Sequence, residues 1–202
     1  MGYWIVRRQR SGAISGWDEV WVYFDSGVRW SKEGYPNRVD LGFVSFNGQP
    51  NPDKASGGQS CLSSPIGAAI ASWDPPLARI WQDNWDLIVQ SAWARGTQLY
   101  DLIAARGAAL HLKTNGCTRR ARFLGDGDQV IRYMNGEDSQ VSIQLGDVDI
   151  AARIRDGIRA DLAGLSSVTW VKIPRELNMA DRAIRELLAK RPKGLGRRNE
   201  WS

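Results

Sequence analysis

Near the C-terminal end, a strand pattern that runs into a helix pattern brings an acidic side chain to a fixed position. Residues 168–173 (VTWVKI) are mostly β-branched or aromatic and are stopped by Pro174, which predicts a strand. Residues 178–190 predict a helix whose N-cap is Asn178. Asp181 then falls in the first turn, where the helix dipole favours an ionised carboxylate. A rigidly held carboxylate is the kind of ligand that a divalent metal ion needs.

The stretch 168–188 (VTWVKIPRELNMADRAIRELL) resembles the end of the ribonuclease H domains of reverse-transcribing elements. Those domains close with a strand, a proline-containing turn, an Asn-x-Ala-Asp motif and a helix. The matching residues are Trp170, Val171, Pro174, Arg175, Glu176, Asn178, Ala180 and Asp181. The resemblance implies an α/β (α+β) fold of the ribonuclease H type, with a mixed sheet, an N-terminal antiparallel hairpin meander and packed helices. It also implies that Asp181 helps to bind catalytic metal, although a capped helix after a strand would explain the same residues on structural grounds alone.

The N-terminal part of the chain offers a second carboxylate in a comparable place. Residues 20–24, within the stretch 17–30, and residues 39–46 predict two strands of a twisted hairpin, and Asp25-Ser26-Gly27 predicts a turn at the end of the first. In the family that the C-terminal segment resembles, the first metal-binding Asp lies at the end of the first strand. The resemblance therefore implies that Asp25 is a metal ligand. Because turns of this composition are common, the weight of this inference comes from the place of Asp25 in the chain.

The middle of the chain departs from the family pattern, which has a Glu at the start of the first helix and an Asp after the fourth strand. The chain has no Glu between Glu33 and Glu137. One register matches Gln98 and Asn115 to the two expected positions. Both positions would then carry neutral amides, which are poor metal ligands beside carboxylates, and the site would be inactive.

A second register keeps carboxylates at both positions. It takes residues 141–145 as the fourth strand and Asp147 as the acidic residue that follows it, with Asp83 or Asp86 in place of the Glu. We favour this register because Asp147 directly precedes a predicted helix that leads to the strand of Trp170. It predicts that Asp25, Asp147 and Asp181 are both the catalytic residues and the metal ligands.

The remaining elements follow from hydrophobic spacing. Residues 77–106 predict a helix with a break near Gly96, and 147–165 predict an amphipathic helix. Short strands are expected around Cys61 and over 108–114, 121–124, 130–134 and 141–145. The tryptophans of the middle region form either a core-facing stripe or a platform for stacking bases: Trp73, Trp81, Trp85 and Trp93. We expect a single domain over residues 1–190, followed by a basic tail over 191–202.

Positive charge gathers at the C-terminal end. The chain carries a formal net charge of +5, and residues 182–202 alone hold seven basic and two acidic residues. Such a segment attracts phosphate whatever the nucleotide sequence, although it could also be only a solvated terminus. The residues that we expect to bind nucleic acid are Arg175, Asn178, Arg182, Arg185, Lys190, Arg191, Lys193, Arg197 and Arg198.

Composition excludes several other function classes. No apolar run is long enough to cross a membrane, and the charge order at the N-terminus is the reverse of a secretory signal. The two cysteines make no disulfide framework and fit a reducing cytoplasm. A single histidine excludes metal motifs that need two and disfavours a Ser-His-Asp triad. Neither of the glycine-rich nucleotide motifs, G-x-x-x-x-G-K-[ST] and G-x-G-x-x-G, is present.

These observations support a first hypothesis of a metal-dependent nuclease. Two Mg²⁺ (or Mn²⁺) ions held by carboxylates would activate a water and stabilise the leaving oxygen of a phosphodiester in an RNA–DNA hybrid, RNA or DNA. The alternative is a catalytically decayed protein of the same fold that binds nucleic acid or assembles a complex. A third possibility is an unrelated α/β protein in which the C-terminal motif is a coincidence.

Overall fold

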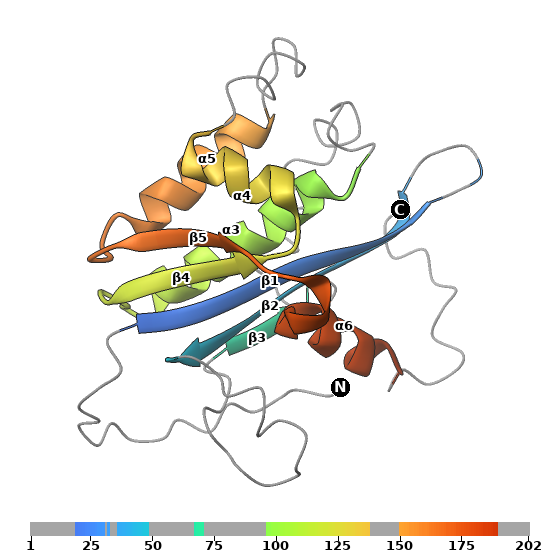
Figure 1. Ribbon diagram of the computed structural model, residues 1–202, viewed down its shortest axis with the longest axis horizontal. Coiled ribbons are helices and arrows are strands. Elements are labelled where there is room, and N and C mark those ends of the chain that lie inside the picture. Colours follow the sequence, from blue (N-terminus) through green and yellow to red (C-terminus); the bar gives the residue numbers. More distant parts are fainter. Residues whose placement is uncertain are drawn as a thin grey trace, which may run out of the picture.

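The protein is built on a mixed β-sheet, seen in a computed structural model that describes residues 19–30, 32, 36–48, 67–70, 96–137 and 150–189. In this described part the sheet has five strands in the order β3-β2-β1-β4-β5 (Figure 1). The strands are β1 (Glu19–Trp30), β2 (Pro36–Asn47), β3 (Gly67–Ile70), β4 (Arg120–Gly125) and β5 (Val168–Lys172). The first three strands pair antiparallel, whereas β1, β4 and β5 run parallel to one another. This is the mixed sheet with an N-terminal antiparallel meander that the sequence predicts.

The hairpin of β1 and β2 is longer than its local turn signals suggest. The predicted turn at Asp25-Ser26-Gly27 is wrong, because β1 continues through it and Asp25 pairs with Gly42 of β2. The partner strand supplies a continuous ladder on this side, and this pairing overrides the turn preference of the three residues. Asp25 is therefore held in the middle of a strand rather than at the tip of a loop.

The first helix of the described region, α3 (Gln98–Thr114), includes a segment that was expected to be a strand. Residues 108–114 continue the helix, so that expectation is wrong. The segment 104–109 (AARGAA) is rich in alanine, the best helix former, and both of its alanine pairs are buried. A run of small residues carries little information on periodicity, which is why the pattern was ambiguous.

A second helix, α4 (Asp128–Asn135), replaces the strand predicted over 130–134. The buried Val130, Ile131 and Met134 are spaced as one face of a helix, and the left-handed Gly136 (φ 78°) ends it. The helix predicted over 147–165 is confirmed as α5 (Ile150–Leu162).

The C-terminal elements agree with their predictions. A short 3-10 helix, η4 (Arg175–Leu177), links β5 to α6 (Met179–Ala189). The amide Oδ1 of Asn178 accepts a hydrogen bond from the Ala180 backbone N–H at 3.1 Å, which confirms Asn178 as the N-cap. Some predictions lie outside the described residues. They are the strand at Cys61, the part of the helix over 77–95, and the four tryptophans of the middle region.

Helices cover both faces of the sheet (Figure 1). On one face, alternate residues of β1 such as Val22 and Phe24 pack in one core with side chains of α3, α4 and α5. On the other face, Tyr23 packs in a smaller core that includes Ala180 of α6. The sheet thus lies between α3, α4 and α5 on one face and α6 on the other. Within the described residues, no helix has the length and apolar character needed to cross a membrane.

Candidate active site

Among the described residues, four aspartates from separate parts of the chain lie close together, just beyond the point where the pairing of β1 with β4 ends. Tyr23 of β1 pairs with Leu124 of β4, and two residues beyond each stand Asp25 and Asp126. Both strands run parallel, so their carboxyl ends meet at the same edge of the sheet. Asp101 comes from the first turn of α3 and Asp181 from the first turn of α6.

Asp25 lies at the centre of this acidic cluster (Asp25, Asp101, Asp126 and Asp181). Its side chain is almost inaccessible, with 7% of the residue exposed. Burial, and then the charges of Asp126 and Asp181, raise the pKa of Asp25 to about 7, against the opposing effects of the Ser26 backbone N–H and Arg175. The site therefore stores negative charge that a proton or a cation can neutralise.

Asp101 lies deepest in the cluster. It is fully buried, and the Ser26 hydroxyl of β1 donates a hydrogen bond to its carboxylate. Burial raises the pKa of Asp101 well above its ordinary range, the Ser26 hydrogen bond lowers it, and the charges of Asp25 and Asp126 raise it. The backbone packs closely against this carboxylate, because a Cβ on Gly127 would stand 2.9 Å from Asp101 Oδ2. A side chain at position 127 would therefore force the Asp101 carboxylate to shift.

Asp126 and Asp181 are partly buried and have polar partners. The Asn178 amide donates a hydrogen bond to Asp126 Oδ1 at 3.1 Å. Asp181 forms ion pairs with Arg185 at 2.7 Å and with Arg175 at 3.5 Å, and both arginine side chains are about two-thirds exposed. Guanidinium groups thus stand at the outer side of the acidic cluster, where a phosphate could reach them.

The comparisons with known proteins bear on the fold. No protein-family model and no curated protein matches the sequence. Among solved structures, the chain is similar to the N-terminal ribonuclease H domain of a Mycobacterium tuberculosis protein, solved as a fusion with maltose-binding protein. The TM-score is 0.51 at 14% identity, covering 85% of this chain and 96% of that chain. This chain has the ribonuclease H fold.

Two further ribonuclease H structures are similar at lower scores. Ribonuclease H1 from the halophilic archaeon Halobacterium salinarum has a TM-score of 0.47 at 18% identity and covers 83% of this chain and 98% of its own. LC11-RNase H1, in complex with an RNA/DNA hybrid, has a TM-score of 0.46 at 16% identity, with 84% and 99% covered.

Of the three predicted metal ligands, the fold brings two close together. Asp25 and Asp181 lie near enough for the charge of one to act on the other. The strand next to β1 is β4, so the acidic residue that follows it is Asp126 and the register that used 141–145 is wrong. Asp147 and residues 141–145 lie outside the described residues, as do Asp83 and Asp86.

The register with two amides is also wrong for the described part of the chain. Asn115 is the C-cap of α3, and the acidic cluster lies at the other end of that helix. Gln98 is the first residue of α3 and precedes Asp101 by one turn. From the family pattern we expected a Glu at the start of this helix, and we did not predict Asp101 as a site residue. The signal for Asp126 was available, since the strand predicted over 121–124 is followed directly by Gly-Asp-Gly.

Of the residues expected on the nucleic-acid surface, Arg175, Arg182 and Arg185 are exposed near Asp181. Asn178 is different, because it is only 2% exposed and its amide is bonded inside the protein. The other expected residues lie outside the described part of the chain: Lys190, Arg191, Lys193, Arg197 and Arg198.

The donor chemistry of the cluster suits a hard cation such as Mg²⁺, since it offers carboxylate oxygens that repel one another. Within the described residues, however, no three Asp, Glu, His or Cys side chains are arranged to hold a metal ion. Two of the carboxylates already have partners within the protein, since Asp181 pairs with two arginines and Asp101 accepts a hydrogen bond from Ser26.

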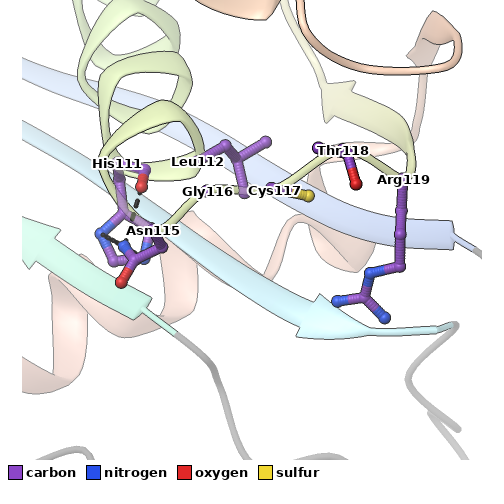
Figure 2. A pocket seen from close by; sticks show the side chains of 7 residues that line it. All are labelled: His111, Leu112, Asn115, Gly116, Cys117, Thr118 and Arg119. Carbon is purple, nitrogen blue, oxygen red and sulfur yellow. Dashed lines mark hydrogen bonds between the residues drawn. The ribbon is translucent and has the colours of Figure 1, made fainter.

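A pocket at the other end of α3 is separate from the acidic cluster. Its lining includes His111, Asn115 and Cys117 (Figure 2). The His111 ring packs on Phe43 at a centroid distance of 5.3 Å, and the Asn115 amide donates to the His111 carbonyl. These contacts stabilise the end of the helix, and none of the described residues that line the pocket carries a carboxylate.

Proposed function

We propose that this protein is a divalent-metal-dependent nuclease that hydrolyses phosphodiester bonds in nucleic acid, with an RNA–DNA hybrid as the expected substrate. Asp25, Asp126 and Asp181 would hold the metal, and Asp101 would complete the acidic site from α3. When bound, Mg²⁺ or Mn²⁺ supplies an activated water and stabilisation of the leaving oxygen. The observation that supports the proposal is the gathering of these aspartates at one edge of the sheet, where burial, and then the charges of Asp126 and Asp181, raise the pKa of Asp25 to about 7.

The surroundings of the carboxylates support binding of the phosphate backbone. Arg175 and Arg185 pair with Asp181 while their side chains remain about two-thirds exposed. A phosphate that enters the site can take over these guanidinium groups, because Arg binds phosphate oxygens in the same bidentate way as carboxylates. Asp181 is then released to face the other carboxylates. The basic tail beyond residue 190 would add attraction that does not depend on nucleotide sequence.

The test is cleavage of labelled RNA–DNA hybrid, duplex RNA and duplex DNA with Mg²⁺ or Mn²⁺. Asp181→Asn and Asp126→Asn keep the size of each side chain and remove its charge, and each is expected to lower cleavage by at least 100-fold. Asp156→Asn on α5 is the matched control, because Asp156 is exposed and pairs only locally with Arg155. Cleavage that survives Asp181→Asn unchanged would contradict the proposed chemistry.

A second candidate function is nucleic-acid binding without catalysis. Two observations favour it, namely that α3 carries the shorter, buried Asp101 where the family pattern has Glu, and that the described side chains form no ready metal cage. It predicts binding of the hybrid by the wild-type protein with salt-dependent affinity and no cleavage with either metal. Binding measured by fluorescence anisotropy beside the cleavage assay separates the two functions.

A further inference from the structure

Asn178 occupies the junction between η4 and α6 and is bonded on every side. Its Nδ2 donates to the Phe24 carbonyl oxygen at 3.1 Å and to Asp126 Oδ1 at 3.1 Å. Its Oδ1 accepts from the Ala180 backbone N–H at 3.1 Å. With 2% of the residue exposed, solvent does not compete for these bonds.

Each of the three partners is either a member of the acidic cluster or the residue directly before one. Phe24 directly precedes Asp25 in β1, and Ala180 directly precedes Asp181 in α6. The third partner is Asp126 itself. One buried side chain thus touches either the acidic residue or its chain neighbour on three elements that are far apart in the sequence.

Helix capping alone does not explain this choice of residue. Ser, Thr or Asp would accept the Ala180 N–H equally well. Only an amide adds two donor hydrogens beside the accepting oxygen, and here both donors have acceptors in the acidic site. The amide is therefore matched to the site as well as to the helix.

We propose that Asn178 is a positioning residue that fixes Asp126 and the start of α6, with Asp181, against the part of β1 that carries Asp25. This role rests on the proposed nuclease function for its effect on turnover, although the link itself is a property of the fold. Loss of the amide leaves a buried carbonyl and a partly buried carboxylate without their donor, so both chain segments are free to shift. Displacements of about 1 Å at a reacting centre lower rates on the order of 100-fold.

The variant that tests the proposal is Asn178→Ser, which keeps a capping oxygen and removes both donors. We expect kcat for hybrid cleavage to fall on the order of 10–100-fold, with KM changed less than about twofold, because the variant keeps the exposed arginine side chains that would bind phosphate. Mn²⁺ affinity, measured by calorimetry without substrate, should weaken by about tenfold. Wild-type turnover and Mn²⁺ affinity in Asn178→Ser would show a capping role only and overturn the proposal.

A double-mutant cycle decides the same question without any activity. Asn178→Ser and Asp126→Ala are made singly and together, and urea midpoints are compared. Coupled residues give a double variant whose midpoint shift is smaller than the sum of the single shifts. Additive shifts would overturn the proposal even if the protein cleaves nucleic acid. If the wild-type protein neither cleaves nor binds Mn²⁺, the proposed function fails, and a non-additive cycle still supports the positioning role of Asn178.

Discussion

The raised pKa of Asp25 makes the acidic cluster a source of instability at neutral pH in the absence of metal. In the folded protein the pKa is about 7, against 3.8 in an unperturbed Asp, a difference of about three units. Each unit corresponds to about 1.4 kcal/mol, so ionising Asp25 in the folded state lowers stability by about 4 kcal/mol. The residue is almost fully buried, so little of this effect is lost to solvent screening.

The direction of the pH dependence follows from proton uptake. Between pH 4 and pH 7 the folded state keeps the Asp25 proton that the unfolded state has released, so stability falls as the pH rises. The contribution is fully present below about pH 4 and is lost above pH 7. Asp25→Asn cannot ionise and so does not show this loss. Relative to the wild type, the variant should therefore gain about 4 kcal/mol on going from pH 4 to pH 8, a change of about 10 °C in Tm.

The assay is urea or thermal unfolding of both proteins between pH 4 and pH 8, in EDTA. Only the difference between the two proteins is interpreted, because titration of groups outside the acidic cluster is shared and the constant effect of replacing a hydroxyl with an amide cancels. Asp156→Asn should follow the wild type at every pH. A wild-type-minus-variant difference that does not change with pH would refute the reasoning, since it would mean that Asp25 ionises normally in the folded protein.

Other consequences of the structure can be tested in the same way. Gly127→Ala should destabilise the protein by about 1–3 kcal/mol in urea unfolding, because the new Cβ meets Asp101 Oδ2, whereas Gly164→Ala, with nothing within 4 Å, should be near neutral. Asp161→Asn removes the buried carboxylate that joins α5 to two basic side chains of α3, and a loss of about 2 kcal/mol is expected in the same measurement. Deleting residues 191–202 removes four basic side chains and should flatten the salt dependence of hybrid binding, measured by anisotropy across a salt series. Unchanged salt dependence after this deletion would leave the tail without a role in binding.

The two ends of the fold could be predicted from the sequence because their signals are local. The stop at Pro174 and the cap at Asn178 lie within five residues of each other, and both are found in the structure. The hairpin of β1 and β2 follows from alternation over long strands. Its detail could not be predicted in the same way, since Asp25 looks like part of a turn until β2 is paired beside it.

The middle of the fold was harder because its helices lack a strong periodic signal. The alanines of α3 are small and similar, so 108–114 could be taken as a strand although it continues the helix. The misplaced fourth strand followed from the same weakness, since 121–124 was one of several short candidates. What separates it from the others is parallel pairing with both β1 and β5, which is a long-range property.

Close packing of α3 explains how an Asp can lie in the acidic cluster. Asp is one methylene shorter than Glu, and yet Asp101 accepts a hydrogen bond from the Ser26 hydroxyl on β1, and the charges of Asp25 and Asp126 raise its pKa. Small residues follow it along the helix, with Ala104, Ala105 and Ala108 all buried. Small side chains let a helix axis lie close to the sheet. The absence of Glu between residues 33 and 137 therefore does not leave this helix without a carboxylate near Asp25, because Asp101 of the closely packed α3 lies there.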